Sequence, residues 1–278
     1  MTDIVVAGPH GPLTLRLYRP DAPAGPGLVW VHGGGFAGGD LDMPEADWVA
    51  RSFAERGIAV VSVDYSLAPL AAAWAEATGQ PPREGVHYPV ASDEIEFAFR
   101  WAAESDLADG PWALGGASAG GNLAAGAALR MSHGDGQGPA LAVLAYPTLH
   151  AVQSTPDAEL RAALDAVPEA DVFFPEAVRG MYENYLGAAA ESGDVYAVPG
   201  TASPEQLVDF PPTIMINSSI DELRVSGEAF AEALRTAHVD VDVSTEPGTG
   251  HGHLNRPEDA AATSSIERFA ARILDTSR

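Results

Sequence analysis

Short apolar runs alternate with longer stretches of helical periodicity along the chain. The apolar runs predict strands at 13–18, 27–31, 59–63, 112–115, 140–146, 213–217 and 239–245. Apolar positions at helical spacing predict helices at 44–56, 89–104, 119–131, 225–237 and 257–274. Several strand runs are apolar at nearly every position, as strands buried on both faces are. This alternation predicts an α/β fold with a mainly parallel central sheet, right-handed crossovers and helices on both faces.

Two stretches interrupt this rhythm. Residues 70–87 are rich in Ala, Gly and Pro where a short connection would suffice, and residues 150–200 hold helix-like pieces separated by prolines. An irregular stretch of this length in a compact α/β domain usually has a functional role, such as a lid or a pocket wall. We therefore expect one domain over residues 1–278, in which segments 70–87 and 150–200 form the roof of a pocket.

The charge of the chain bears on its partners. It carries 39 acidic residues against 15 basic ones, all of them Arg, for a net charge of −24. Such a surface repels phosphate backbones and anionic membranes, so we expect no nucleic-acid partner and no membrane partner. No block of like charge stands out, which favours a well-solvated acidic surface over an acidic binding tail.

The absence of cysteine and the first residues of the chain bear on its chemistry and its location in the cell. The sequence has no cysteine, which excludes disulfides, thiolate metal sites and cysteine nucleophiles. Its first residues lack the basic and apolar regions of a signal peptide, and no apolar run approaches membrane-spanning length. We expect a cytoplasmic protein without a metal or other cofactor. Whether it forms a homodimer stays open.

A glycine-flanked serine is the first candidate for chemistry. Gly116, Ser118 and Gly120 form a Gly-x-Ser-x-Gly frame between a predicted strand and a predicted helix. A strand that turns abruptly into a helix strains its central residue and leaves no room for side chains beside it, and this geometry presents a nucleophilic hydroxyl. A glycine-rich structural turn gives the same five residues. The frame alone therefore leaves both interpretations open.

A serine nucleophile needs a histidine base and an acid that orients the histidine. In sheets built around such a turn, the order along the chain is Ser, then Asp or Glu, then His, each after the carboxyl end of a strand. Asp221 follows the predicted strand 213–217, and His251 follows the predicted strand 239–245. Asp221 could instead cap the helix that begins near Leu223. The order of the three residues favours catalysis.

Two histidines compete for the role of base. Gly250 and Gly252 flank His251 and would let its loop approach the serine, whereas His253 suits the lining of a pocket. Two histidines two residues apart on a loop, without carboxylate partners, make a poor set of metal ligands. We therefore predict His251 as the base and no metal site.

Hydrolysis also needs N–H donors for the oxyanion that forms on a substrate carbonyl. The segment 32–36, His-Gly-Gly-Gly-Phe, directly follows the predicted strand 27–31. Consecutive glycines there could be a flexible turn. With Ser118 downstream, they favour an oxyanion loop instead, because glycines bring amide donors close to a substrate without a side-chain clash. We expect His32 to anchor this loop by a hydrogen bond.

Taken in order, several segments resemble those of the bacterial hormone-sensitive-lipase-like esterases, a branch of the α/β-hydrolases, from about Leu28 onward. The matching segments are 32–36, 39–41, 64–69, 116–122, 221–224 and 251–253. The sequence departs from the family's pattern in the residue before the serine, Ala117, and at Ser66, Leu70 and His253. These departures concern the substrate more than the chemistry.

The resemblance implies an α/β-hydrolase fold with a reduced cap, and a hydrolase of short to medium or aromatic carboxylic esters that works through an acyl-enzyme. It implies Ser118 as nucleophile, Asp221 as acid and His251 as base, and an oxyanion hole made by three amides, those of Gly34, Gly35 and Ala119. Side chains expected near a small-molecule substrate are Phe36, Tyr65, Tyr146, Tyr185, Leu223 and His253. Hydrolysis of an amide, carbamate, lactone or thioester is the alternative, and a ligand-binding receptor on the same fold is less favoured.

Overall fold

A single eight-stranded sheet organises the protein. The computed structural model describes residues 1–21, 25–70, 72–79 and 81–277, so residues 71 and 80 of the predicted roof, residues 22–24 and residue 278 of the predicted domain lie outside the description. The strands are β1 (Thr2–Gly8), β2 (Gly11–Tyr18), β3 (Gly27–Val31), β4 (Ala59–Asp64), β5 (Trp112–Ala117), β6 (Ala142–Ala145), β7 (Thr213–Ile220) and β8 (Val241–Gly250).

The sheet is mainly parallel, as predicted. Its strand order is β1-β2-β4-β3-β5-β6-β7-β8. The β1–β2 and β2–β4 pairs are antiparallel, and every pair from β4–β3 onward is parallel. The carboxyl ends of the parallel strands therefore meet along one edge, where functional loops gather in such sheets.

The edge strand β1 was not among the predicted strands. It forms a hairpin with β2, with Ile4 opposite Leu15 and Val6 opposite Leu13. All of its residues are exposed or only partly buried, and it contributes just Ile4 and Val6 to the edge of the core. An edge strand buries too little apolar surface to give a strong sequence signal.

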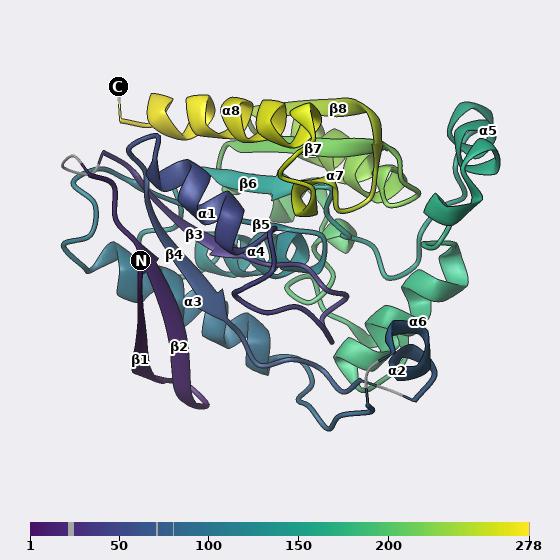
Figure 1. The fold of residues 1–278 in the computed structure, drawn as a ribbon, viewed down its shortest axis with the longest axis horizontal. Coiled ribbons are helices and arrows are strands. Elements are labelled where there is room, and N and C mark those ends of the chain that lie inside the picture. Colours follow the sequence, from purple (N-terminus) through teal and green to yellow (C-terminus); the bar gives the residue numbers. More distant parts are fainter. Residues whose placement is uncertain (22–24, 71, 80, 278) are drawn as a thin grey trace.

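Helices cover both faces of the sheet (Figure 1). They are α1 (Asp47–Ala54), α2 (Ala72–Thr78), α3 (Val90–Ala103), α4 (Ala119–Ser132), α5 (Ala158–Ala166), α6 (Pro175–Leu186), α7 (Arg224–Thr236) and α8 (Ala260–Asp275). Helices α1 and α8 pack against one face, and α3, α4 and α7 pack against the other. The predicted helices are all present, whereas α2 lies in a segment for which no helix was predicted.

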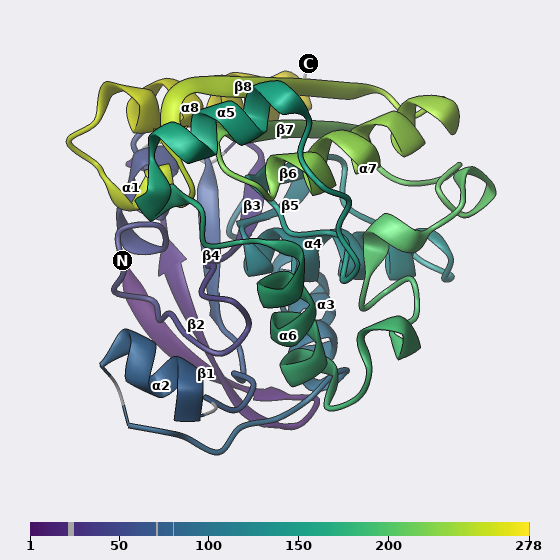
Figure 2. The ribbon, with the colours of Figure 1, turned by 90° about the vertical axis from the view of Figure 1, so that its right-hand side faces the viewer.

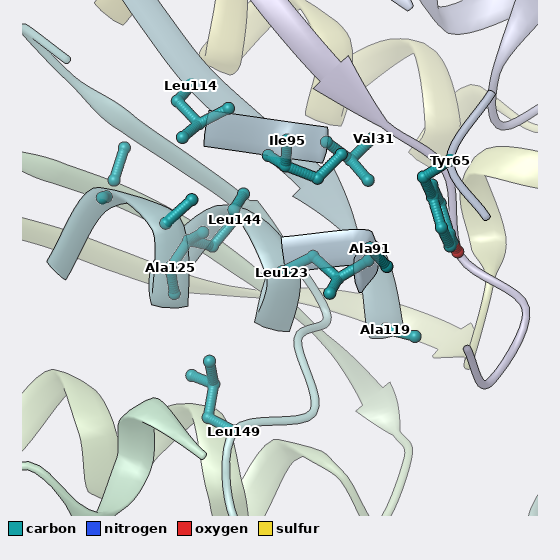
Figure 3. Close-up of a cluster of buried hydrophobic side chains, with 14 of the residues drawn as sticks. Val31, Tyr65, Ala91, Ile95, Leu114, Ala119, Leu123, Ala125, Leu144 and Leu149 are labelled. Atoms are coloured by element: carbon teal, nitrogen blue, oxygen red, sulfur yellow. The ribbon is translucent and has the colours of Figure 1, made fainter. Parts of the chain in front are cut away.

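A hydrophobic layer fills each side of the sheet. On one side Leu123 of α4 packs with Val31 and Leu114 of the strands, as Figure 3 shows. On the other side Trp30 packs edge-on against Phe53 of α1. Burial of each large apolar side chain contributes roughly 1.5–3 kcal/mol, so the two layers fix the strands on which the functional loops stand.

Helices α2, α5 and α6 stand apart from the helices that cover the sheet faces. They lie at the right of Figure 1, and they face the viewer in Figure 2. The two ends of the segment around α2 are held together, because Leu70 and Arg83 form an antiparallel bridge. The Arg83 guanidinium also donates to the Ala37 carbonyl. Within the described chain, no helix has the length and apolar character needed to cross a bilayer.

Candidate active site

Ser118 occupies a strained turn between β5 and α4. Its backbone angles are φ 53° and ψ −118°, a conformation that costs a residue with a side chain roughly 1–3 kcal/mol. A Cβ atom on Gly116 would lie 2.6 Å from the Val31 carbonyl oxygen, and one on Gly120 would lie 2.2 Å from the same atom. Only glycine fits at these two positions. The Ser118 amide donates to the Ala145 carbonyl at 2.9 Å, which helps to hold the turn.

A line of hydrogen bonds joins Ser118 to the two other predicted residues. His251 Nε2 lies 2.9 Å from Ser118 Oγ, and His251 Nδ1 lies 2.7 Å from Asp221 Oδ2. Asp221 is fully buried, and its other carboxylate oxygen accepts the Leu223 amide at 3.0 Å. Asp221 thus holds the turn before α7 and orients His251 at the same time, so the two alternatives weighed for it coexist.

The surroundings of His251 favour its protonated form. Burial lowers the pKa of His251, but the charge and hydrogen bond of Asp221 raise it, as does the charge of Glu45, and the net direction is upward from 6.5. Two rings make T-shaped contacts with the imidazole, with centroid distances of 5.0 Å for Tyr146 and 4.4 Å for Phe173. The side chain keeps 16% of its surface exposed.

The glycine loop lies directly beside Ser118. A Cβ atom on Gly33 would lie 3.0 Å from Ser118 Cβ, and Gly34 and Gly35 have φ values of +118° and +60°. The amides of Gly34 and Gly35 donate to no acceptor in the described residues. Ala119 is the first residue of α4, a position whose N–H has no partner within a helix. These three amides are the donors expected for an oxyanion.

His32 anchors the glycine loop, as predicted. Its Nδ1 donates to the Gly33 carbonyl at 2.8 Å, and burial lowers the pKa of His32, which keeps the ring neutral. Tyr65 stacks on this ring at a centroid distance of 4.5 Å and donates its hydroxyl to the His32 carbonyl. Tyr65, predicted to lie near a substrate, therefore packs on His32 and holds the glycine loop in place.

His253 has a different place from the one expected for a pocket residue. It is 1% exposed, and its two ring nitrogens lie 2.9 Å from Ser218 Oγ and 2.9 Å from Ser265 Oγ. Burial lowers the pKa of His253 to about 4, so the ring is neutral. Because both nitrogens are bonded within the protein, this side chain fixes the His251 loop to β7 and α8 and has no polar atom left for a ligand.

The other predicted pocket residues are also buried. Phe36 stacks on Tyr185 at a centroid distance of 4.1 Å, and Tyr146 directs its hydroxyl to Glu45. Leu223 is fully buried beside Asp221. Contact between these side chains and a substrate stays a prediction.

Two buried carboxyl groups near the site were missed by the sequence analysis. Glu45 precedes α1, where a glutamate looks like an ordinary acidic residue at a helix start. Glu222 follows Asp221, and burial raises the pKa of Glu222 to about 7, with the charge of Asp171 as a further cause. No local pattern distinguishes either residue from a solvated glutamate, because their burial depends on segments distant in sequence.

Comparison with known proteins extends this picture. A model of the α/β hydrolase fold family matches residues 28–78 and 82–255. The esterase LipI of Mycobacterium tuberculosis is 31% identical over 267 residues, which cover 91% of this chain and 75% of that protein. The carboxylic ester hydrolase LipN of the same organism is 32% identical and matches 92% of this chain and 64% of its own length. The ethyl acetate hydrolase of Pseudomonas putida is 30% identical and matches 87% of this chain and 71% of its own length.

Solved structures agree with the sequence relatives. The esterase of Pyrobaculum calidifontis superposes with a TM-score of 0.81 at 29% identity, over 99% of this chain and 85% of that one. A bacterial heroin esterase superposes with a TM-score of 0.79 at 27% identity, over 100% of this chain and 84% of that one. Both superpositions thus include the sheet and the loops around Ser118. No group of three or more potential metal ligands occurs among the described residues.

Proposed function

The chain belongs to the α/β-hydrolase fold family, and from this premise we propose that it hydrolyses carboxylic esters with Ser118, His251 and Asp221 as its catalytic triad. The family match and the esterase relatives confirm the fold class and the family resemblance predicted from the sequence. The observation that carries the proposal is the line of hydrogen bonds from Ser118 through His251 to the buried Asp221. A receptor would have no need of this arrangement on a strained turn.

The first half of the reaction forms an acyl-enzyme. As Ser118 Oγ bonds to the ester carbonyl carbon, His251 Nε2 takes its proton and the carbonyl electron pair moves onto oxygen. Asp221 stabilises the imidazolium through Nδ1. When the tetrahedral intermediate collapses, the bond to the alcohol oxygen breaks, and His251 gives its proton to that oxygen as the alcohol leaves.

Water releases the acid in the second half. His251 takes a proton from water while the water oxygen bonds to the acyl carbon, and collapse of this second intermediate frees Ser118, which regains its proton from His251. In both halves the negative oxygen would lie against the amides of Gly34, Gly35 and Ala119. Loss of one such donor typically slows an enzyme about 10²–10³-fold.

The substrate class is tested with a panel of nitrophenyl esters and matching nitroanilides of graded acyl length, together with a carbamate, a lactone and a thioester of similar size. We expect turnover of acetate and butyrate esters and little turnover of the anilides, because all the relatives named above are esterases. Nitrophenoxide is also a better leaving group than the nitrogen of an anilide, which must be protonated before it leaves. Faster cleavage of amides, carbamates, lactones or thioesters than of esters would overturn the assignment to carboxylic esters.

We infer that α2 forms part of the pocket roof. A Cβ atom placed on Gly35 would lie 3.2 Å from the Trp74 ring and 3.5 Å from Met181 Sδ of α6. Both side chains thus stand against a predicted oxyanion glycine, where an acyl chain must pass. Phe173, from the segment between α5 and α6, packs on His251 from another side. These contacts support the roles expected for segments 70–87 and 150–200.

Replacement of Trp74 should change the preferred acyl length. In Trp74→Ala the space left by the ring is expected to raise kcat/KM for an octanoate ester, relative to acetate, by about tenfold, since one or two methylenes in a pocket are worth about that much. Trp101→Ala, which removes a partly buried Trp from α3, is the matched control and should leave the ratio unchanged. If a folded Trp74→Ala protein shows the wild-type ratio of kcat/KM for octanoate to acetate, α2 does not form part of the pocket roof.

Charge and composition bear on the partners and the location of the protein. We infer a small-molecule substrate, no cofactor and a cytoplasmic location. The net charge of −24 disfavours binding to nucleic acids and anionic membranes, and nothing in the proposed steps needs a metal ion. The acyl and alcohol groups of the natural ester are matters for the substrate panel.

A further inference from the structure

Glu45 lies at the centre of a buried polar cluster. Only 2% of its surface is exposed, and its carboxylate has three hydrogen-bond donors. The Gly33 amide donates to Oε1 at 2.8 Å, while the Tyr146 hydroxyl and the Asn255 amide donate to Oε2 at 2.5 and 3.1 Å. An ionised carboxylate offers only acceptors and so matches this set of donors. The cost of burying the charge is offset by these bonds.

The three donors belong to different parts of the site. Gly33 is the first glycine of the loop that carries the predicted oxyanion amides. A Cβ atom placed on it would lie 2.6 Å from Glu45 Oε1 and 3.0 Å from Ser118 Cβ, so the loop passes close to both residues. Asn255 closes the short turn that follows His251. Its Oδ1 also accepts the Glu45 amide at 3.1 Å, so Asn255 holds both the backbone and the side chain of Glu45.

Tyr146 completes the connection. Its hydroxyl binds Glu45, and the edge of the same ring packs against His251 and His253 with centroid distances of 5.0 Å to each. Its backbone has φ 33°, and its amide is held by the Ile216 carbonyl at 2.7 Å. The glycine loop and the His251 loop are therefore both tied to one carboxylate, by Gly33 on one side and by Asn255 and Tyr146 on the other.

We propose that Glu45 is a positioning residue for the hydrolysis, one that fixes the oxyanion loop relative to His251 and adds a second negative charge that acts on the imidazole. The inference rests on the proposed function. No sequence segment used for the family resemblance contains Glu45, and neither Ser118 nor a substrate bound to it would need to touch its carboxylate. Its effect is therefore exerted through Gly33, Tyr146 and Asn255.

The charges around the cluster make this effect measurable. The titratable groups that face it are His32, Tyr65, Tyr146, Asp221, His251 and His253, with Arg256 beside His253. Burial lowers the pKa values of His32 and His253 and raises those of the two tyrosines, so these four groups are neutral near pH 7. Asp221 and Glu45 are then the negative charges that act on His251, and both raise its pKa.

Glu45→Gln removes the charge and keeps the shape. We expect kcat for an acetate ester to fall about 10- to 100-fold with KM little changed, because loosened positioning near a reacting centre has effects of this size. We also expect the acid limb of the kcat/KM profile to move to lower pH by about one unit or less, since loss of a nearby negative charge destabilises protonated His251. A purely structural role for Glu45 would not move that limb.

Two further variants separate charge from geometry. Tyr146→Phe keeps the Glu45 carboxylate and removes the hydrogen bond from the Tyr146 hydroxyl to it. We therefore expect kcat to fall, while the acid limb of the kcat/KM profile does not move to lower pH. Glu94→Gln is the matched control, because Glu94 is similarly buried but, within the described residues, accepts hydrogen bonds only from the Ser66 amide and hydroxyl, at 2.7 and 2.8 Å. It is expected to lower the melting temperature and to leave both kcat and the pH profile as in the wild type.

The outcomes distinguish this inference from the proposed function. Wild-type kcat and an unshifted acid limb in folded Glu45→Gln, alongside wild-type hydrolysis that depends on Ser118, would overturn the role of Glu45 alone. Absence of Ser118-dependent hydrolysis in the wild type would overturn both. If Glu45→Gln does not fold, Asn255→Ala decides the question: a fall in kcat with unchanged KM supports the tie to the His251 loop, and wild-type kcat refutes it.

Discussion

Ser118→Ala is expected to lower kcat for a nitrophenyl butyrate by about 10⁶-fold, the scale seen when a triad nucleophile is lost. Among the described residues, the Ser118 side chain hydrogen-bonds only to His251, and the substitution removes no core volume beyond one buried hydroxyl. We therefore expect the variant to fold and to melt within a few degrees of the wild type, since a change near 1 kcal/mol moves the melting temperature of a protein this size by about 2–4 °C.

The control for this loss is the binding of substrate itself. The glycine loop and the roof do not depend on the Ser118 hydroxyl, so Ser118→Ala should still bind a non-hydrolysed ester analogue with wild-type affinity. Retention of more than a trace of the esterase activity in a purified, folded Ser118→Ala protein would show that the nucleophile lies elsewhere.

Asp221→Asn is expected to lower kcat by about 10⁴-fold, because it favours the wrong tautomer of His251. Asparagine keeps the oxygen that accepts the Leu223 amide, so the turn before α7 is preserved. Its NH₂ group, however, faces His251 Nδ1 and favours the tautomer with the proton on Nε2, the nitrogen that lies 2.9 Å from Ser118 Oγ. A protonated Nε2 cannot accept the serine proton.

The pH profile provides a second readout for Asp221→Asn. In the wild type the raised pKa of His251 places the acid limb of kcat/KM above pH 6.5, because the base must be neutral to act. Loss of the Asp221 charge should move the limb of the residual activity to lower pH. Asp240→Asn is the matched control. Asp240 precedes the first residue of β8, whereas His251 follows the last, so this variant should leave kcat and the pH profile unchanged. A residual rate near that of the wild type would remove Asp221 from the triad.

The sequence was informative where function depends on order along the chain. Ser118, Asp221 and His251 each follow a strand of the parallel sheet, so the strand pattern and the chain order were enough to predict their meeting. The glycines at 116 and 120 carried a further signal, because each lies against the backbone of β3 and admits no side chain.

The rest depended on contacts between distant segments. Glu45 and Asn255 are separated by 210 positions, and nothing local to either residue predicts that they bind each other. His253 was expected to line the pocket, because it stands where the resembling family has a pocket-facing aromatic, yet its ring is buried and hydrogen-bonded to Ser218 and Ser265. Helix α2 has a similar explanation, since it lies in an Ala-rich stretch with little periodicity and gains its packing from the glycine loop and the core.

The role of Ser118 as the activated nucleophile is tested by titration with diethyl nitrophenyl phosphate, because this reagent phosphorylates a serine only where a base and an oxyanion site activate it. We expect that one diethylphosphoryl group is added per chain, that peptide mapping places it on Ser118, and that esterase activity falls in proportion to the label. Ser118→Ala should take up none. Full esterase activity in the labelled protein, or loss of activity with the label on another residue, would show that Ser118 is not the nucleophile.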